Sequence, residues 1–248
     1  MVVIDKFLEQ HSLTEEEYIK LLEYWNDEVV FARLKDEAVQ IRKTYYGNKV
    51  HTRGVIEFTN YCRDNCYYCG IRRDNCSIIR YRLTKEEILA CGQSGYALGY
   101  RTFVLQGGED PWYKDAYIVE IIQDIKKQFP ECAVTLSIGE KSYESYRKFR
   151  HAGADRYLLR HETADKELYH LLHPTSMSNK NRKQCLYNLK ELGYQVGAGF
   201  MVGIPGQTMS HLAKDLVFLQ ELHPEMVGIG PFIPHHDTIY DSETVGSF

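Results

Sequence analysis

Cys62, Cys66 and Cys69 lie in one short loop with the spacing C-x3-C-x2-C. Such a loop can present three thiolates to a single inorganic centre, and this density of cysteines favours metal ligation over a disulfide framework. A structural zinc ion usually takes four protein ligands, so Cys76 or a histidine would have to supply the fourth. A four-iron cluster held by three thiolates instead leaves one iron free to bind a small molecule. The residues alone leave both kinds of metal centre open.

A series of short β-rich segments, alternating with helical segments, must position this loop. Six segments are predicted to be strands: residues 55–59, 102–106, 133–137, 156–160, 195–202 and 226–230. Helices are predicted between them, beginning near Thr84, Ile118, Ser142, Ser178 and Thr208. This alternation is typical of βα units that feed a parallel sheet.

The first fifty residues are predicted to form two amphipathic helices. Thr14 and Glu17 have the spacing of a capping box, and apolar residues follow them at helical spacing. A second apolar pattern begins at Val30 and continues to Gly47, where the helix is expected to end. We therefore expect a helical N-terminal extension at residues 1–50 and a βα core at residues 51–248.

Residues that could bind a ligand or take part in catalysis lie directly after the predicted strands. The cysteine loop follows the first strand, a Gly-Gly-Glu segment at residues 107–109 follows the second, and residues 160–162 end the fourth. Consecutive parallel strands with right-handed crossovers form an open sheet or a barrel, and barrels place their active sites at the carboxyl ends of the strands. We predict an α/β fold, a partial barrel of the TIM type with about six parallel strands.

Composition narrows the class of protein. The chain has 248 residues, of which 44% are hydrophobic and 26% charged, so it can bury a sizeable core and is not predominantly disordered. Its net charge of −4 argues against a nucleic-acid binder. No apolar run approaches the roughly 20 residues that span a bilayer, and the first residues lack the pattern of a signal peptide. We expect a cytoplasmic protein with no membrane or nucleic-acid partner.

The cysteine loop, with Tyr68 directly before its last cysteine, resembles the signature of the radical S-adenosylmethionine (SAM) superfamily. The resemblance extends over residues 54–234. It implies that Cys62, Cys66 and Cys69 hold a [4Fe–4S] cluster, and that the amino and carboxylate groups of SAM chelate the fourth iron. It also places Tyr68 in the cofactor site.

Further positions match the cofactor site of that superfamily. Gly107, Gly108 and Glu109 are similar to the segment that receives the methionyl amino group, although a Gly-Gly pair by itself usually marks a turn. Glu162 matches the position that contacts the ribose hydroxyls near the sulfonium, and its alternative role is to favour a helix N-terminus. Arg182 matches the arginine that pairs with the cofactor carboxylate, where the alternative is an exposed helical arginine.

Four other side chains complete the predicted site. Met201 resembles the apolar contact with adenine, although Pro205 and the residues after it stand where the wider family often has a glutamate. Thr135 and Ser137 share one face of a strand, so they are expected either to line a cavity or to be core hydroxyls. Arg160 is the candidate for holding an anionic substrate by bidentate pairing, and we expect it to be catalytic together with Glu162.

Residues 56–62, 69–75, 156–163 and 228–235 are similar to the HydE-type maturases of [FeFe]-hydrogenase, with biotin synthase and methylornithine synthase as relatives. Biotin synthases carry a second cluster on strand-end cysteines. Cys91, Cys132 and Cys185 instead lie in predicted helices or before a strand, so they are expected to be buried apolar residues.

The resemblance implies an enzyme that reductively cleaves SAM to a 5′-deoxyadenosyl radical during assembly of the hydrogenase H-cluster. Its substrate would be an iron complex or another small molecule. A ferredoxin- or flavodoxin-type electron donor and other hydrogenase maturases are the implied partners.

Two alternatives stay open. Relatives look like complete eight-stranded barrels, so this chain is expected to lack the last strands and part of the substrate pocket. The first alternative is a methylornithine synthase-like or biotin synthase-like radical enzyme, and the second is a non-catalytic metal-binding fragment that holds zinc. His235, His236 and Asp237 are expected to be solvated near the terminus rather than to bind a metal.

Overall fold

The computed structural model describes residues 2–246, so Met1, Ser247 and Phe248 lie outside the described residues. Three helices come first: α1 (Val2–Gln10), α2 (Glu15–Leu22) and α3 (Glu28–Tyr46). The predicted capping box of α2 is present, because the Thr14 hydroxyl accepts the Glu17 N–H and the Glu17 carboxylate accepts the Thr14 N–H. Helix α3 ends before Gly47, as predicted, whereas α1 was not predicted.

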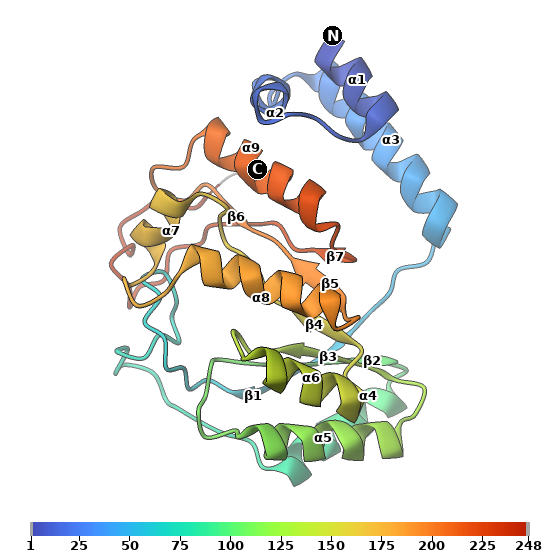
Figure 1. Cartoon of the computed structure of the whole chain (residues 1–248), viewed down its shortest axis with the longest axis vertical. Coiled ribbons are helices and arrows are strands. Elements are labelled where there is room, and N and C mark those ends of the chain that lie inside the picture. Colours follow the sequence, from blue (N-terminus) through green and yellow to red (C-terminus); the bar gives the residue numbers. More distant parts are fainter. Residues whose placement is uncertain (1, 247–248) are drawn as a thin grey trace.

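Helices and strands then alternate along the chain, with α4, α5 and α6 grouped together on one side of the sheet (Figure 1). In order they are β1 (Gly54–Thr59), α4 (Lys85–Ala97), β2 (Thr102–Gly107), α5 (Asp115–Gln128), β3 (Ala133–Ser137), α6 (Tyr143–Ala152), β4 (Arg156–Leu158), α7 (Lys166–Leu172), α8 (Asn179–Glu191), β5 (Gln195–Ala198), β6 (Met201–Val202), α9 (Met209–Leu222), β7 (Met226–Val227) and β8 (Gly230–Pro231). Each of the six predicted strands is present in whole or in part, and α7 is the one further helix that the sequence did not suggest.

Six strands form one parallel sheet in the order β1-β2-β3-β4-β5-β7. This confirms the α/β class and the six parallel strands. Within the described residues the sheet does not close on itself, because β1 and β7 are its two edges. Strands β6 and β8 form a separate parallel pair at the carboxyl ends of β5 and β7.

The prediction of one continuous strand over residues 195–202 was wrong. The chain bends at Gly199, which has a φ of 157°, and only then continues as β6. A Cβ on Gly199 would collide with the carbonyl oxygen of Gly228 in the neighbouring segment. The predicted strand at residues 226–230 is also interrupted, opposite Gly199. It consists of β7 and β8, just as the predicted strand at residues 195–202 consists of β5 and β6.

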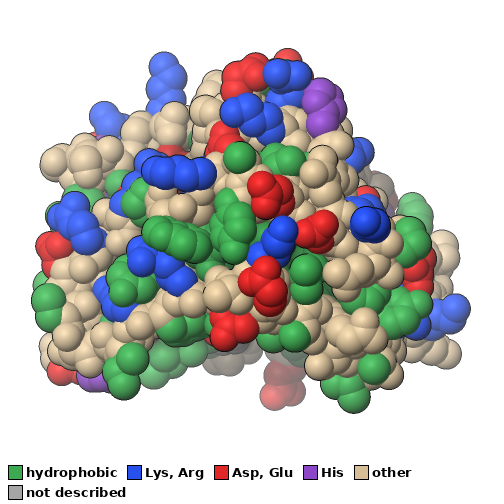
Figure 2. Space-filling view, turned by 90° about the horizontal axis from the view of Figure 1, so that it is seen from below, with side chains coloured by type: hydrophobic (Ala, Val, Ile, Leu, Met, Phe, Trp, Pro, Cys, Tyr) green, Lys and Arg blue, Asp and Glu red, His purple; other side chains and the backbone are tan. Residues whose placement is uncertain are grey.

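The main core lies between the sheet and helices α4, α5, α6 and α8. Its fully buried members include Phe103, Ile122, Leu136, Phe149 and Leu186. They come from alternate positions of the strands and from single faces of the helices, as the two periodicities require. Figure 2 views the molecule from the side of α5, and on that face acidic, basic and apolar side chains are interspersed.

Helix α2 packs against α9, which joins the N-terminal helices to the rest of the chain (Figure 1). The contact buries Leu13 and Tyr18 against Ala213, and the Tyr18 hydroxyl donates to Gln220 at 2.9 Å. The division of the chain near residue 50 therefore stays a prediction. No helix in residues 2–246 has both the length and the apolar character that crossing a membrane requires.

Gly199→Ala should destabilise the protein by about 2–4 kcal/mol, from a strained φ together with the collision at Gly228. Gly206 is the matched control, since its φ of 80° is also positive but a Cβ at that position would meet no atom within 4 Å. Gly206→Ala should therefore cost only the backbone strain, about 1 kcal/mol. Urea unfolding of both variants measures the difference, and equal losses would contradict the role of the Gly199–Gly228 contact.

Candidate cofactor site at the strand ends

The cysteine loop leaves β1 and rests on the turn that follows β2. The Glu109 N–H donates to Cys62 Sγ at 3.4 Å, and the Arg63 N–H donates to the Glu109 carbonyl at 2.9 Å. Gly108 permits this approach, because a Cβ there would collide with the Tyr61 carbonyl and lie 2.7 Å from Cys62 Cβ. The glycine pair is thus required for the close contact of two backbones.

Cys62, Cys66 and Cys69 are free thiols, and each is only partly exposed. Burial raises the pKa of all three thiols, that of Cys62 to about 11, so binding of a metal centre must displace protons from them. Four sulfur or nitrogen ligands around zinc would bring the sulfurs within about 4 Å of one another. In the described part of the chain these three thiols form no set of atoms within 4.8 Å, and Cys76 is exposed and donates to the Asp74 carbonyl. The loop suits the larger iron–sulfur cluster better than a zinc ion.

A cavity of about 480 Å³ opens at the carboxyl ends of the strands, beside the cysteine loop. Five of the predicted residues line it: Gly107, Ser137, Arg160, Glu162 and Arg182. They come from β2, β3, the end of β4 and helix α8. The cavity thus collects polar groups from four elements, as expected for a site at the strand ends of a barrel.

Glu162 is held in an unusual conformation at the edge of this cavity. Its φ is 65°, in the left-handed region, and its backbone N–H donates to the Gly199 carbonyl at 3.1 Å. Arg160 Nε lies 3.5 Å from Glu162 Oε1, while Oε2 is buried and has no hydrogen-bond partner among residues 2–246. A buried carboxylate oxygen without a partner beside a cavity indicates a ligand with hydrogen-bond donors.

Buried side chains behind the cavity fix the segment that carries Glu162. His161 and Asp215 are fully buried, with Nε2 and Oδ1 3.3 Å apart, and the Asp215 carboxylate also accepts the Ala164 N–H. Asn179 donates to the Thr163 carbonyl at 2.8 Å. This His–Asp pair cannot be recognised from the sequence, because nothing in the spacing of the two residues shows that α9 packs behind β4.

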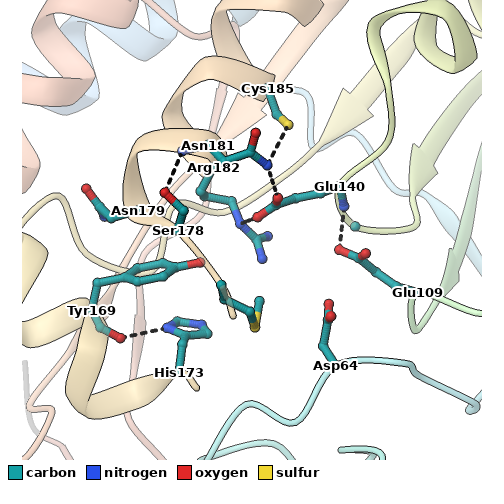
Figure 3. A network of polar contacts seen from close by, with 12 residues as sticks. Asp64, Glu109, Glu140, Tyr169, His173, Ser178, Asn179, Asn181, Arg182 and Cys185 are labelled. Carbon is teal, nitrogen blue, oxygen red and sulfur yellow. Dashed lines mark hydrogen bonds and ion pairs between the residues drawn. The ribbon is translucent and has the colours of Figure 1, made fainter. Parts of the chain in front are cut away.

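Arg182 is buried and paired with Glu140, whose Oε1 lies 2.7 Å from Arg182 Nε (Figure 3). It is therefore not the exposed helical arginine of the alternative interpretation. The Glu140 N–H donates to the Glu109 carboxylate, and Arg63 binds the same carboxylate at 2.8 Å. Burial, with the nearby Asp64 charge, raises the pKa of Glu109 to about 7. Glu140 was not predicted, and it connects the two predicted residues Glu109 and Arg182.

The remaining predicted residues lie around this centre. Tyr68 and Met201 pack in one apolar cluster with Phe232. Thr135 is buried, and its hydroxyl has no hydrogen-bond partner, so it is not the satisfied core hydroxyl that was one of the two expectations. The structure does not bring Thr135 or Glu109 to the wall of the 480 Å³ cavity.

Two expectations about other residues need correction. Cys132 and Cys185 are buried as predicted, but Cys91 is exposed on α4. Asp237 is half-buried rather than solvated, because its carbonyl accepts Arg72 and its carboxylate accepts Asn75 at 3.1 Å. The segment after β8 thus packs on the cysteine loop.

The fold and the site together define a class of protein. A sequence profile described as "Radical SAM superfamily" matches residues 56–219, and the chain belongs to that superfamily. Within it, the chain belongs with the HydE maturases: it is 50% identical to the [FeFe] hydrogenase maturase subunit HydE of Thermotoga maritima, over 97% of this chain and 68% of the relative.

Two further relatives show how far the likeness extends. The 3-methylornithine synthase of Methanosarcina acetivorans is 30% identical over 94% of this chain and 66% of its own length. A crystal structure of methylornithine synthase (PylB) superimposes with a TM-score of 0.86 at 29% identity, covering 97% of this chain and 70% of that one. The chain thus spans about two thirds of the length of these curated relatives.

Members of this superfamily use a [4Fe–4S] cluster and SAM, and the residues present fit both groups. Three half-buried thiols in one loop, with the next cysteine, Cys76, exposed, suit a cluster with one open iron. The unpartnered Glu162 oxygen and the polar cavity suit a ligand with hydroxyl and ammonium groups. The chain is therefore an enzyme of a superfamily that uses these two cofactors, and membership implies a small-molecule substrate and a reductant.

His173 belongs to the buried surroundings of the cysteine loop. Its ring stacks on Tyr169 at 3.9 Å, and Nδ1 lies 3.0 Å from the Tyr169 carbonyl, so Nδ1 carries the proton and donates it (Figure 3). Burial lowers the pKa of His173 to about 3, which keeps the ring neutral at pH 7.

The neutral His173 should make folding sensitive to acid. Its pKa is lower in the folded than in the unfolded chain, so its contribution is complete above pH 6.5 and is lost as the pH falls towards 3. His173→Gln keeps a donor and removes the titration. Between pH 7.5 and pH 5.5 the free energy of unfolding should fall by about 1 kcal/mol less in the variant than in the parent. Identical pH profiles in urea unfolding would show that His173 is not held neutral.

Proposed function

We propose that this protein reductively cleaves SAM to generate a 5′-deoxyadenosyl radical, and that it acts in assembly of the [FeFe]-hydrogenase H-cluster. The observation that carries the proposal is the three-thiol loop seated beside a cavity lined by Arg160, Glu162 and Arg182. The identity of 50% to HydE favours hydrogenase maturation over the methylornithine synthase alternative, where it is 30%.

The cysteines and the turn after β2 would hold the cofactors. Cys62, Cys66 and Cys69 bind the cluster, and when bound this group supplies the electron that breaks the S–C5′ bond of SAM. Gly107 and Gly108 let the backbone approach the methionyl amino group closely. The Glu109 carboxylate is already engaged by Arg63 and by the Glu140 N–H, so it acts by fixing this turn.

The other predicted side chains would orient SAM. Glu162 accepts hydrogen bonds from the ribose hydroxyls, since its Oε2 has no partner in the described part of the chain. Arg182 receives the cofactor carboxylate and is oriented for this by Glu140. Met201, which packs in the apolar cluster with Tyr68 and Phe232, offers an apolar surface to adenine, and Ser137 contributes a hydroxyl group from β3 at the cavity wall.

Arg160 is the residue best placed to hold an anionic substrate. Its side chain is 41% exposed at the cavity, so its guanidinium keeps donors free although it lies near Glu162. We propose an iron complex or a related small molecule as substrate, a ferredoxin- or flavodoxin-type electron donor, and other hydrogenase maturases as partners. The cytoplasmic location stays a prediction.

The radical chemistry can be tested directly. The protein, purified without oxygen, loaded with iron and sulfide and reduced, should give a [4Fe–4S]⁺ electron paramagnetic resonance signal that shifts when SAM is added. 5′-Deoxyadenosine should form in the same sample. Single Cys→Ser changes at Cys62, Cys66 or Cys69 should abolish both results, whereas Cys91→Ser, at an exposed helical cysteine, should keep them. Bound zinc, or a signal indifferent to SAM, would refute the proposal.

Glu162→Gln should weaken SAM binding about tenfold, because a charge-assisted hydrogen bond to the ribose is lost while the volume is kept. Cluster content should not change, since Glu162 is not a thiol ligand. Equilibrium dialysis with the loaded protein measures the affinity, and Glu167→Gln is the control at an exposed neighbouring carboxylate. An unchanged affinity in Glu162→Gln would remove Glu162 from the cofactor site.

A further inference from the structure

Arg80 makes an unusual set of contacts just outside the cysteine loop. Its Nη1 donates to the carbonyls of Asn60 and Ile71, the latter at 2.9 Å. Its Nη2 donates to the carbonyls of Arg72 and Asn75, at 2.7 and 3.0 Å. One guanidinium thus binds four backbone carbonyls and no carboxylate.

The four carbonyls lie at both ends of the cysteine loop. Asn60 precedes Cys62 by two residues, and Ile71 and Arg72 follow shortly after the last cysteine. Arg80 is itself fixed in space, since the segment after it runs antiparallel to the end of β1 through the contact between Thr59 and Arg82. The guanidinium therefore joins the entry of the loop to its exit.

Only arginine can make this set of contacts. Its donors are arranged in a rigid plane, so each terminal nitrogen can serve two acceptors in fixed directions. A lysine ammonium carries the same charge on one atom and cannot reach four carbonyls at once. An Arg80→Lys variant thus loses the four hydrogen bonds but keeps the positive charge, so the effects of the two can be measured separately.

Arg80 also lies close enough to influence the last cysteine. Its guanidinium donates to the carbonyl of Ile71, two residues after Cys69. The reduction potential of an iron–sulfur cluster depends on nearby charge. A change of the potential in an Arg80 variant therefore reports loss of the charge, whether or not the hydrogen bonds to the four carbonyls are kept.

We propose that Arg80 is the positioning residue of the cluster: its guanidinium closes the cysteine loop on itself, so that Cys62, Cys66 and Cys69 are presented together to one inorganic centre. The inference deepens the proposed function, because it concerns the same loop. It does not depend on SAM cleavage, since its readouts are retention and potential of the cluster.

The test compares Arg80→Lys, Arg80→Gln and Arg73→Gln, each loaded with iron and sulfide without oxygen. Arg73 is the matched control, because it lies close by in the chain but its side chain is 61% exposed and pairs with the exposed Asp74 carboxylate. Loss of the cluster to an iron chelator is followed by visible absorbance. Both Arg80 variants should lose it about tenfold faster than the parent protein, and Arg73→Gln at the parent rate.

Two further measurements distinguish positioning from general damage to the fold. Hydrogen exchange of the metal-free proteins should increase in residues 60–75 and stay unchanged in β2 and β3 in the Arg80 variants. The midpoint potential of the cluster should be kept in Arg80→Lys and become more negative in Arg80→Gln, because only the second change removes the charge.

The inference is overturned if both Arg80 variants retain the cluster as long as the parent, or if Arg80→Lys does so while Arg80→Gln does not. The second result would assign Arg80 an electrostatic role alone. If Arg80→Gln does not fold, the rate of cluster loss in Arg80→Lys alone tests the proposal: faster loss than in the parent supports it, and an equal rate overturns it. Failure of the parent to cleave SAM would refute the proposed function and leave these comparisons intact.

Discussion

Parallel pairing of β1 with β2 sets the contact on which the site rests. The register joins Thr59 to Gly107, and the next residue, Gly108, lies against the Tyr61 carbonyl and Cys62 with no room for a side chain. Because the cysteine loop is seated on that contact, the direction in which its thiols project follows from the sheet. The cavity between Glu162 and Arg182 then lies beside the thiols through the pairing of the later strands, since parallel strands end at the same edge.

Much of the fold could be predicted from local patterns. The capping box at Thr14 and the start of α4 at Thr84 are as expected, and β3 has the predicted bounds. The errors arise where contacts with segments distant in the sequence determine the backbone conformation. Gly199 ends β5 because the Gly228 carbonyl occupies the space of a side chain, and that neighbour is not visible in the local sequence. Helices α1 and α7 were missed because nine and seven residues carry too little periodicity.

In the candidate site, too, some residues could be recognised from local sequence and others only from the packed structure. The three cysteines could be named as candidates because they lie in one loop, and Glu162 and Arg182 because they match a known motif, and their binding roles stay predictions. Glu140 could not, since it becomes informative only when α8 brings Arg182 to 2.7 Å from it. The pair of His161 and Asp215 is separated by more than fifty residues, and its complete burial is a property of the packed structure alone.

The burial of the three thiols has a consequence for the life of the protein before it receives its cluster. Thiolates, not thiols, react with disulfides and peroxides, so a cysteine whose pKa is raised reacts slowly at neutral pH. The pKa of Cys62 is raised to about 11, and those of Cys66 and Cys69 are raised as well. In the folded chain these three sulfurs are thus held mainly as thiols at neutral pH, the form that reacts slowly. The burial that surrounds the proposed cluster site therefore also lowers the reactivity of its cysteines toward oxidants.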